Sequence, residues 1–137
     1  MEQQLIIKAF LHEIWNQQAF DKIDAFLHPD FEDHSLPASY PRGKEGTIQW
    51  ITQTGNSFRH LSFIESLVTE GNQCMIRIRM RLVHIGTWRN IEPTQAEIEC
   101  FGYRHFILKD GKIRAHYALI DGQSIESQIR QKSSNKT

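Results

Sequence analysis

The chain has 137 residues, and its 16 basic residues balance its 16 acidic ones. This length fits one domain, and the scattered Lys and Arg form no basic stripe of the kind that binds nucleic acid or an anionic membrane. No apolar run approaches the roughly 20 residues that cross a bilayer, and residues 1–30 lack a secretory signal pattern. We therefore expect a cytoplasmic protein without a nucleic-acid or membrane partner.

The cysteines and histidines do not indicate a metal site. Cys74 and Cys100 lack the short paired spacing of zinc ligands, and two cysteines do not make a disulfide scaffold. None of the seven histidines lies two or four positions from another, as strand or helix ligands often do. We expect two buried thiols, no metal and no cofactor.

The first half of the chain has helical periodicity. Apolar residues recur every three or four positions in residues 3–16, which predicts an amphipathic helix. A shorter helix is expected over residues 21–27, before Pro29. A third helix is predicted through residues 44–54, and Gly55 is expected to stop it.

After Leu61 the apolar period changes to two, as on a β-strand with one buried face. In "CMIRIRMRLVH" the apolar residues alternate with arginines, and His84 falls on the apolar side. The Asp-Gly of "KDGK" predicts a tight hairpin turn. Three or four antiparallel strands are expected.

Helices followed by antiparallel strands predict one α+β domain over residues 1–130, with the helices on one face of the sheet. A short helix from Gly122 to about Gln128 is expected to close this domain. The polar residues 131–137 have nothing to pack against and are expected to form a mobile tail.

Two segments carry motifs in a distinctive order. "IWNQQAFDKIDAFLHPDFEDHSLPASYPRGKEG" runs from a Trp-Asn helix end through Asp33 and His34 to a Gly-x-Glu-Gly helix start. "GTW" and "IEPTQAEIECFGYRHFILKDGKIRAHYALID" hold a Pro-Thr turn, an Asp-Gly-Lys-Ile hairpin and a final strand with His116. Up to Ile129, this set resembles the SnoaL-like polyketide cyclases, a branch of the nuclear transport factor 2-like superfamily.

The resemblance implies a cone-shaped fold, in which a strongly curved, mostly antiparallel sheet packs on N-terminal helices and encloses a pocket, usually in a homodimer. Superfamily members close polyketide rings, isomerise steroids or open epoxides, so the expected ligand is a small hydrophobic, polyketide- or steroid-like molecule. Two functions stay open: a cofactor-independent cyclase or isomerase that uses acid–base chemistry, and a binding or dimerisation module without turnover.

His116 is the first candidate catalytic residue. In the family's final His-Trp-Asp strand, the histidine and the carboxylate two positions later point the same way and can act on one ligand. His116 and Tyr117 match the first two positions, but Ala118 takes the place of the catalytic acid. Apolar alternation from Ile113 to Leu119 also turns His116 toward the outer face of the sheet, unless a dimer buries that face.

His34 is the second catalytic candidate, because the resemblance places it near the cavity and imidazole can act as acid or base at neutral pH. Its alternative is a polar loop residue. Arg104 shares the inner face of its strand with Phe106, where it needs a carboxylate or an anionic ligand, unless it lies on the open sheet edge. His84 is either a hydrogen-bonded core residue or a pocket residue.

Three tryptophans complete the candidates. Aromatic walls are usual in pockets for flat hydrophobic ligands, although such residues also form plain core or dimer contacts. The candidate ligand-binding set is Trp15, Trp50, His84, Trp88, Arg104, Phe106 and Ala118.

Overall fold

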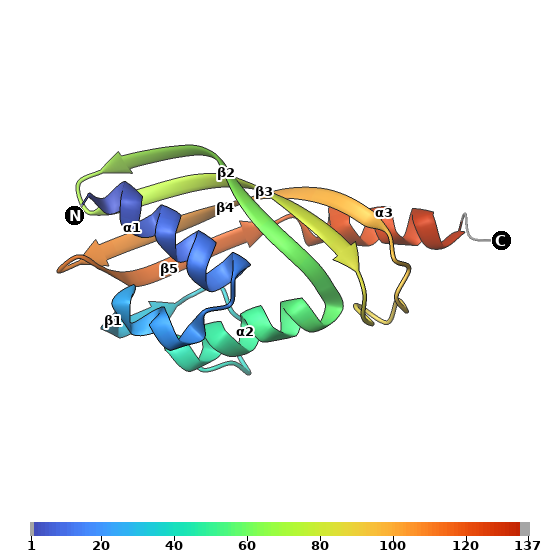
Figure 1. Cartoon of the computed structure of the whole chain (residues 1–137), viewed down its shortest axis with the longest axis horizontal. Coiled ribbons are helices and arrows are strands. Elements are labelled where there is room, and N and C mark those ends of the chain that lie inside the picture. The colour runs from blue at the N-terminus through green and yellow to red at the C-terminus, as the bar shows by residue number, and fades with distance from the viewer. Residues whose placement is uncertain (1, 135–137) are drawn as a thin grey trace.

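The computed structural model describes residues 2–134, which form several helical segments and one curved sheet (Figure 1). The helical segments are α1 (Gln3–Phe10), the π-helix η1 (Leu11–Asn16), the 3-10 helix η2 (Phe20–Ala25), α2 (Lys44–Ser57) and α3 (Gly122–Ser134). The strands are β1 (Leu27–Asp33), β2 (Phe58–Glu70), β3 (Gln73–His84), β4 (Glu97–Lys109) and β5 (Lys112–Ile120).

The sheet has the strand order β1-β5-β4-β3-β2, and only the β1–β5 pair is parallel. Figure 1 shows α1 and α2 on one side of the sheet, whose long strands bend over them. The predicted α+β cone, with N-terminal helices on a curved and mostly antiparallel sheet, is therefore confirmed.

Strand β1 was not predicted from the sequence. Pro29 lies inside it, where the sequence indicated the end of a helix. A proline is tolerated here because β1 is an edge strand and its pairing with β5 is irregular between Leu27 and Glu32. The predicted hairpin at Asp110 and Gly111 is confirmed, and both residues have positive φ.

The helix boundaries differ from the prediction in four places. The second helix, expected over residues 21–27, is a 3-10 helix over Phe20–Ala25, and Leu27 already belongs to β1. The first helix widens into a π-helix over its last six residues, and α2 continues past Gly55 to Ser57. The closing helix extends beyond Gln128 to Ser134, so it includes part of the expected tail. Residues 135–137 of that tail lie outside the described residues.

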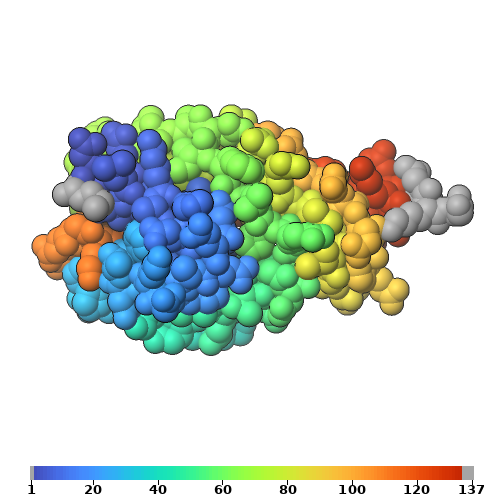
Figure 2. Space-filling view, in the orientation of Figure 1, coloured from blue at the N-terminus to red at the C-terminus, as the bar shows by residue number. Residues whose placement is uncertain are grey.

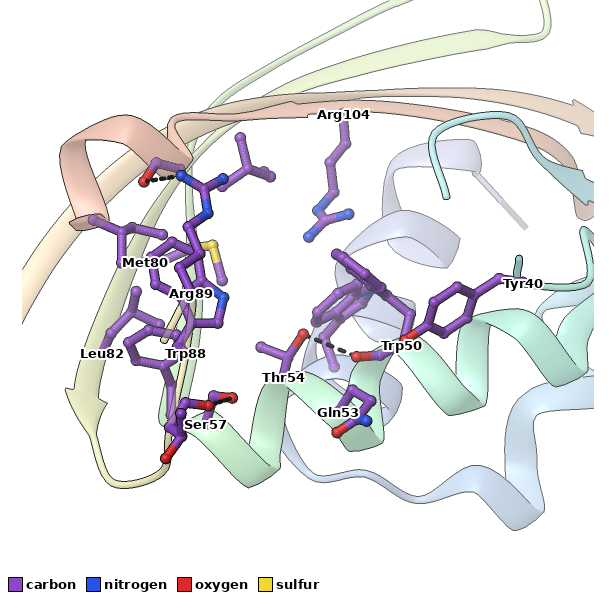
Figure 3. Close-up of a pocket in the computed structure, with 16 residues that line it drawn as sticks. Tyr40, Trp50, Gln53, Thr54, Ser57, Met80, Leu82, Trp88, Arg89 and Arg104 are labelled. Carbon is purple, nitrogen blue, oxygen red and sulfur yellow. Dashed lines mark hydrogen bonds between the residues drawn. The ribbon is translucent and has the colours of Figure 1, made fainter. Parts of the chain in front are cut away.

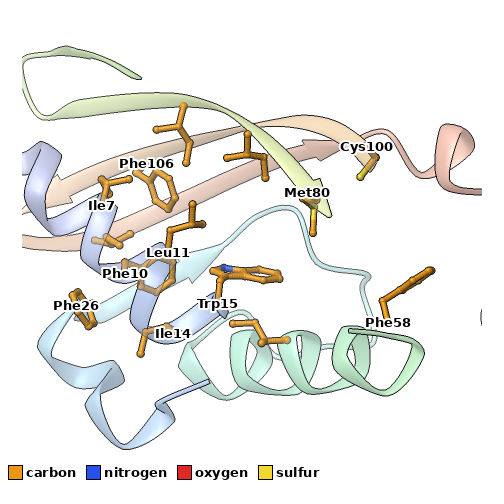
Figure 4. Packing of buried hydrophobic residues seen from close by; sticks show 14 of the residues in the cluster. Ile7, Phe10, Leu11, Ile14, Trp15, Phe26, Phe58, Met80, Cys100 and Phe106 are labelled. Atoms are coloured by element: carbon orange, nitrogen blue, oxygen red, sulfur yellow. The ribbon is translucent and has the colours of Figure 1, made fainter. Parts of the chain in front are cut away.

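One hydrophobic core fills the space between the helices and the concave face of the sheet (Figure 4). Phe10 and Trp15 enter it from the first helical segments, and Phe106 enters from β4. Both thiols are buried and free, as predicted, and burial raises the pKa of Cys100 to about 11.

The N-terminal segments also pack against the tip of the β4–β5 hairpin, which Figure 2 shows in orange beside the blue helices. Lys112 Nζ donates a hydrogen bond to the carbonyl of Asp24 (2.9 Å). In residues 2–134, no helix combines the length and apolar character that spanning a membrane requires.

Candidate functional site

A β-bulge in β5 sets the direction of the site residues. Leu108 of β4 lies opposite Ile113, but the next residue back, Ile107, lies opposite Ala115. Arg114 is therefore an extra residue in β5. A single inserted residue shifts the alternation of all later side chains by one position.

The shift turns His116 toward the interior, where it is only 4% exposed. Tyr117 and Leu119 point outward and are 43% and 76% exposed. The expectation that these two residues share the inner face with Ile113 is therefore wrong. The bulge therefore buries the His116 side chain within its own chain, and no partner subunit is needed to bury it.

Parallel pairing of β1 with β5 places Asp33 beside His116. The Nδ1 atom of His116 lies 2.8 Å from Oδ2 of Asp33, and both side chains are buried. The backbone N–H and the hydroxyl of Ser35 donate to Oδ1 of the same carboxylate. Because an ionised carboxylate only accepts, Nδ1 of His116 carries a proton.

Arg104 reaches the other side of the imidazole ring. Its Nη1 lies 3.4 Å from Nε2 of His116, and its guanidinium lies over the ring of Trp15 at 4.2 Å. A guanidinium only donates, so Nε2 accepts. A neutral imidazole thus stands between the Asp33 carboxylate and the Arg104 cation.

The pKa shifts agree with these charges. Burial lowers the pKa of His116 and the nearby Arg104 cation lowers it further, against the hydrogen bond to Asp33. Burial alone would raise the pKa of Asp33, but the interactions with His116 and Ser35 outweigh it and lower this pKa. Burial lowers the pKa of Arg104 to about 10, which leaves it cationic at neutral pH.

Arg104 lies in the wall of a cavity of about 490 Å³, a volume suited to a small molecule. Figure 3 shows its side chain extending from the sheet toward the α2 residues Trp50 and Thr54. The other aromatic lining residues are Trp15, Tyr40, Phe58 and Trp88. His116 lies behind Arg104 and does not line the cavity itself.

The predicted ligand-binding residues fall into two groups. Trp15, Trp50, Trp88 and Arg104 line the cavity. His84, Phe106 and Ala118 do not.

His84 belongs to the core. It is fully buried, its Nδ1 lies 3.0 Å from Oγ1 of Thr94, and its ring packs against Phe58. The sequence left open whether His84 is a hydrogen-bonded core residue or a pocket residue, and these contacts favour the first.

Phe106 and Ala118 lie outside the cavity and contact or adjoin His116 and Arg104. The ring of Phe106 is fully buried and stacks on His116 at 4.8 Å between ring centroids. Ala118 lies directly opposite Arg104 in the β4–β5 pairing. Neither residue is placed to contact a ligand in the cavity, but Phe106 packs against His116 and Ala118 is the strand neighbour of Arg104.

His34 lies outside the cavity. Its ring is exposed and stacks on Tyr117 at 4.8 Å, on the outer side of β5. Of the Asp-His pair, Asp33 points to the site, and this was missed in the sequence. Alternation of Phe31 and Asp33 on a recognised strand could have indicated it, because both are buried.

In residues 2–134, no three His, Cys, Asp or Glu side chains are grouped to hold a metal ion. The site is thus described by the buried row Asp33, His116 and Arg104 and by the aromatic cavity that Arg104 enters. The bent mixed sheet wraps around the N-terminal helices and leaves such a cavity. This arrangement defines a cone-shaped fold of the nuclear transport factor 2-like type.

Comparison with known families agrees with this class. The family model described as SnoaL-like polyketide cyclase matches residues 6–129, and the chain belongs to this family. No protein with a curated description is detectably similar in sequence.

Solved structures share the fold at low sequence identity. Wild-type IdmH from Streptomyces antibioticus superposes with a TM-score of 0.84 at 20% identity, covering 94% of this chain and 99% of that one. TsrD from Streptomyces laurentii gives 0.81 at 20% identity, covering 92% of each chain. A SnoaL-like polyketide cyclase from Agrobacterium tumefaciens gives 0.78 at 18% identity, covering 94% and 98%.

Proposed function

We propose that this protein binds a small hydrophobic carbonyl compound in its cavity and moves a proton on it, with His116 as the acid–base group. The observation that supports this most is the buried hydrogen bond between His116 and Asp33, next to the cavity residue Arg104. A histidine held by a carboxylate is a common arrangement for general acid–base catalysis.

Each residue of the row has a distinct role in the proposal. Asp33 holds the proton on Nδ1, which leaves the lone pair of His116 on Nε2. A ligand oxygen can replace Nε2 of His116 as the hydrogen-bond partner of the Arg104 guanidinium. Nε2 is then free to accept a proton from the carbon beside the carbonyl. Arg104 then stabilises the negative charge on the oxygen, and Asp33 stabilises the imidazolium.

The cycle closes when His116 returns its proton to another carbon of the same ligand. This sequence describes an isomerisation, in which no atom is gained or lost. Ala118 leaves His116 as the only acid–base group of the pair expected on β5, so we propose isomerisation ahead of polyketide ring closure.

A binding module without turnover is the second candidate. It is favoured by the contact between Arg104 and Nε2 of His116, which occupies the nitrogen that would act as base. It is also favoured by the missing carboxylate at Ala118.

We also propose that the protein forms a homodimer through the outer face of the sheet. Tyr103 and Leu119 lie opposite each other on this face, and Phe101 and Tyr117 extend the exposed apolar surface. Apolar patches of this kind mark interaction surfaces. The cytoplasmic location expected from the sequence stays a prediction.

Deuterium exchange tests the enzymatic proposal. The protein is incubated with 2-tetralone, a flat ketone with acidic α-protons, in D₂O, and the α-proton signals are followed by NMR. The wild type is expected to accelerate exchange, and His116→Gln is expected to slow it about 10²-fold or more.

His34→Gln is the matched control, since the His34 side chain lies outside the cavity, and it should exchange like the wild type. Equal exchange in the wild type and His116→Gln would contradict catalysis by His116. Binding of 2-tetralone without any exchange would favour the binding module.

A further inference from the structure

We propose that the cavity selects ligands that carry a carboxylate, and that Arg104 binds this group. The inference deepens the proposed function and rests on the cavity being a ligand site, but it does not require the ligand to react. It names the ligand class as flat, mostly apolar carboxylic acids.

The charge of Arg104 is buried without a direct counter-ion in residues 2–134. Its side chain is only 3% exposed, yet no carboxylate of the described residues lies within ion-pair distance of it. By contrast, Arg79 on the surface holds both Glu65 and Glu99, at 2.9 and 2.8 Å. A buried cation without a direct counter-ion is costly, whereas an exposed one is not.

Asp33 does not contact Arg104 directly, because the ring of His116 lies between the two side chains. Its two oxygens already accept hydrogen bonds from His116 and Ser35. Arg104 keeps a single long contact, 3.4 Å, to Nε2 of His116, and its Nε has no partner among the described residues. Guanidinium donors facing the cavity therefore remain available to a ligand.

A second buried group beside Arg104 also lacks partners. His60 lies on β2 with both ring nitrogens buried and without a hydrogen-bond partner in residues 2–134. Its ring meets the edge of Trp15, whose face carries Arg104, with 6.1 Å between ring centroids. Buried polar atoms without partners are rare. His60 does not line the cavity itself, but its imidazole, which has no partner in the described part of the chain, is close enough to Arg104 to sense its charge.

The electrostatics around Trp15 and Arg104 favour an anion. Burial and the charge of Arg104 both lower the pKa of His60, as they do for His116. The two imidazoles are therefore neutral, and Arg104 supplies the positive charge around Trp15. A carboxylate placed there gains an ion pair and hydrogen bonds without displacing another acid.

The second arginine of the lining differs from Arg104. Arg89 is exposed, lies over the ring of Trp88, and already pairs with Glu126 at 3.1 Å. Arg104 is thus the better anchor for a ligand, and Arg89 offers a control in the same cavity.

The chemistry of the ligand follows from the lining. Aromatic walls suit a flat ring system, and a guanidinium binds two neighbouring oxygens at once. A β-keto acid would satisfy both proposals, because its carboxylate and keto oxygen can share Arg104 while its α-carbon carries the mobile proton.

Binding of two matched compounds tests the inference. We would measure calorimetric dissociation constants of 2-naphthoate and of 2-naphthamide, which has the same shape without the charge. The wild type should bind the acid at least about tenfold more tightly. Arg104→Gln should abolish this preference and keep the affinity for the amide, while Arg89→Gln should keep the preference.

Equal affinity for the two compounds in the wild type, failure of both to bind, or a preserved preference in Arg104→Gln would overturn the proposal. If Arg104→Gln does not fold, ¹⁵N NMR of the wild-type arginine side chains replaces it. Naphthoate should shift the Arg104 Nε–H signal and leave that of Arg89 in place, and the reverse pattern would contradict the assignment. Neither measurement involves turnover, so a negative deuterium-exchange result leaves this inference standing.

Discussion

His116 and Asp33 are hydrogen-bonded at 2.8 Å although 83 positions separate them in the sequence. Two features of the backbone make this contact: the parallel pairing of β1 with β5 and the bulge at Arg114. Without either one, the two side chains would not meet inside the cone.

Asp33→Asn should separate the chemical role of this carboxylate from ligand binding. An amide cannot stabilise the imidazolium of His116, so deuterium exchange of 2-tetralone should fall about 10²-fold or more while its binding is kept. Asparagine has one acceptor oxygen where aspartate has two, so it must give up its bond with His116 or with Ser35, and the free energy of unfolding should fall by about 1–3 kcal/mol. Ser35→Ala leaves the carboxylate in place and should have a smaller effect on exchange; an equal effect would contradict the assigned role.

Stability should fall toward acid because of His116. Its folded pKa lies below the ordinary value of 6.5, so the unfolded chain takes up a proton first as the pH falls through 6.5. The groups that act on its charge are Asp33 on β1 and Arg104 and His105 on β4. Urea unfolding between about pH 8 and pH 5 should therefore show a smaller loss of stability in His116→Gln than in the wild type.

A second acid limb belongs to Asp33. Its folded pKa lies below 3.8, so its stabilising effect is present above pH 3.8 and is lost as the pH falls through the folded value.

The His116 prediction has a clear contradicting result. If the free energy of unfolding depends on pH in the same way in the wild type and His116→Gln between about pH 8 and pH 5, His116 is not held neutral in the folded protein.

Ala118→Asp should supply Arg104 with the carboxylate that it lacks. The two residues lie opposite each other on β5 and β4, and both point to the inner side. We expect weaker binding of 2-naphthoate and unchanged binding of 2-naphthamide, measured by calorimetry. Unchanged naphthoate binding would contradict the role of Arg104 as the anion site.

The wild type is expected to show no appreciable ring closure of polyketide substrates. Position 118 has a methyl group where the resemblance expects the catalytic acid, and general acid–base help is worth about 10²–10⁴ in rate. Turnover of such substrates by the purified protein, followed by product chromatography, would contradict this expectation.

The proposed dimer can be tested on its apolar surface. Leu119→Asp places a charge in the centre of the exposed patch and should give a monomer in sedimentation velocity runs, because burying an unpaired charge is costly. Leu5→Asp introduces the same charge on α1, on the helical side, and should leave the dimer intact. A wild type that stays monomeric at high concentration would refute the dimer itself.

Regular alternation made parts of the site predictable. On β3 and β4 it runs without interruption, and the inner positions of His84 and Arg104 follow from it correctly. The family resemblance extended to the cone fold, which the structure has. These features depend on local sequence patterns, and such patterns are visible in one chain.

The rest of the site depends on contacts that local patterns do not carry. Arg114 looks like an ordinary outward residue of β5, yet as the bulge it reverses the direction of His116. Asp33 lies on the edge strand β1, which the sequence does not predict because Pro29 lies inside it. The partner strand β5 is far away in the sequence. A non-local pairing of this kind is decided by tertiary packing.

The protonation state of His116 provides the sharpest test of the proposed roles of Asp33, His116 and Arg104. Long-range ¹H–¹⁵N correlation spectra of the wild type at neutral pH distinguish the two neutral tautomers from the imidazolium. We expect a neutral ring with the proton on Nδ1, where it is hydrogen-bonded to Asp33, and an unprotonated Nε2 facing Arg104. A proton on Nε2, or an imidazolium, would contradict these roles.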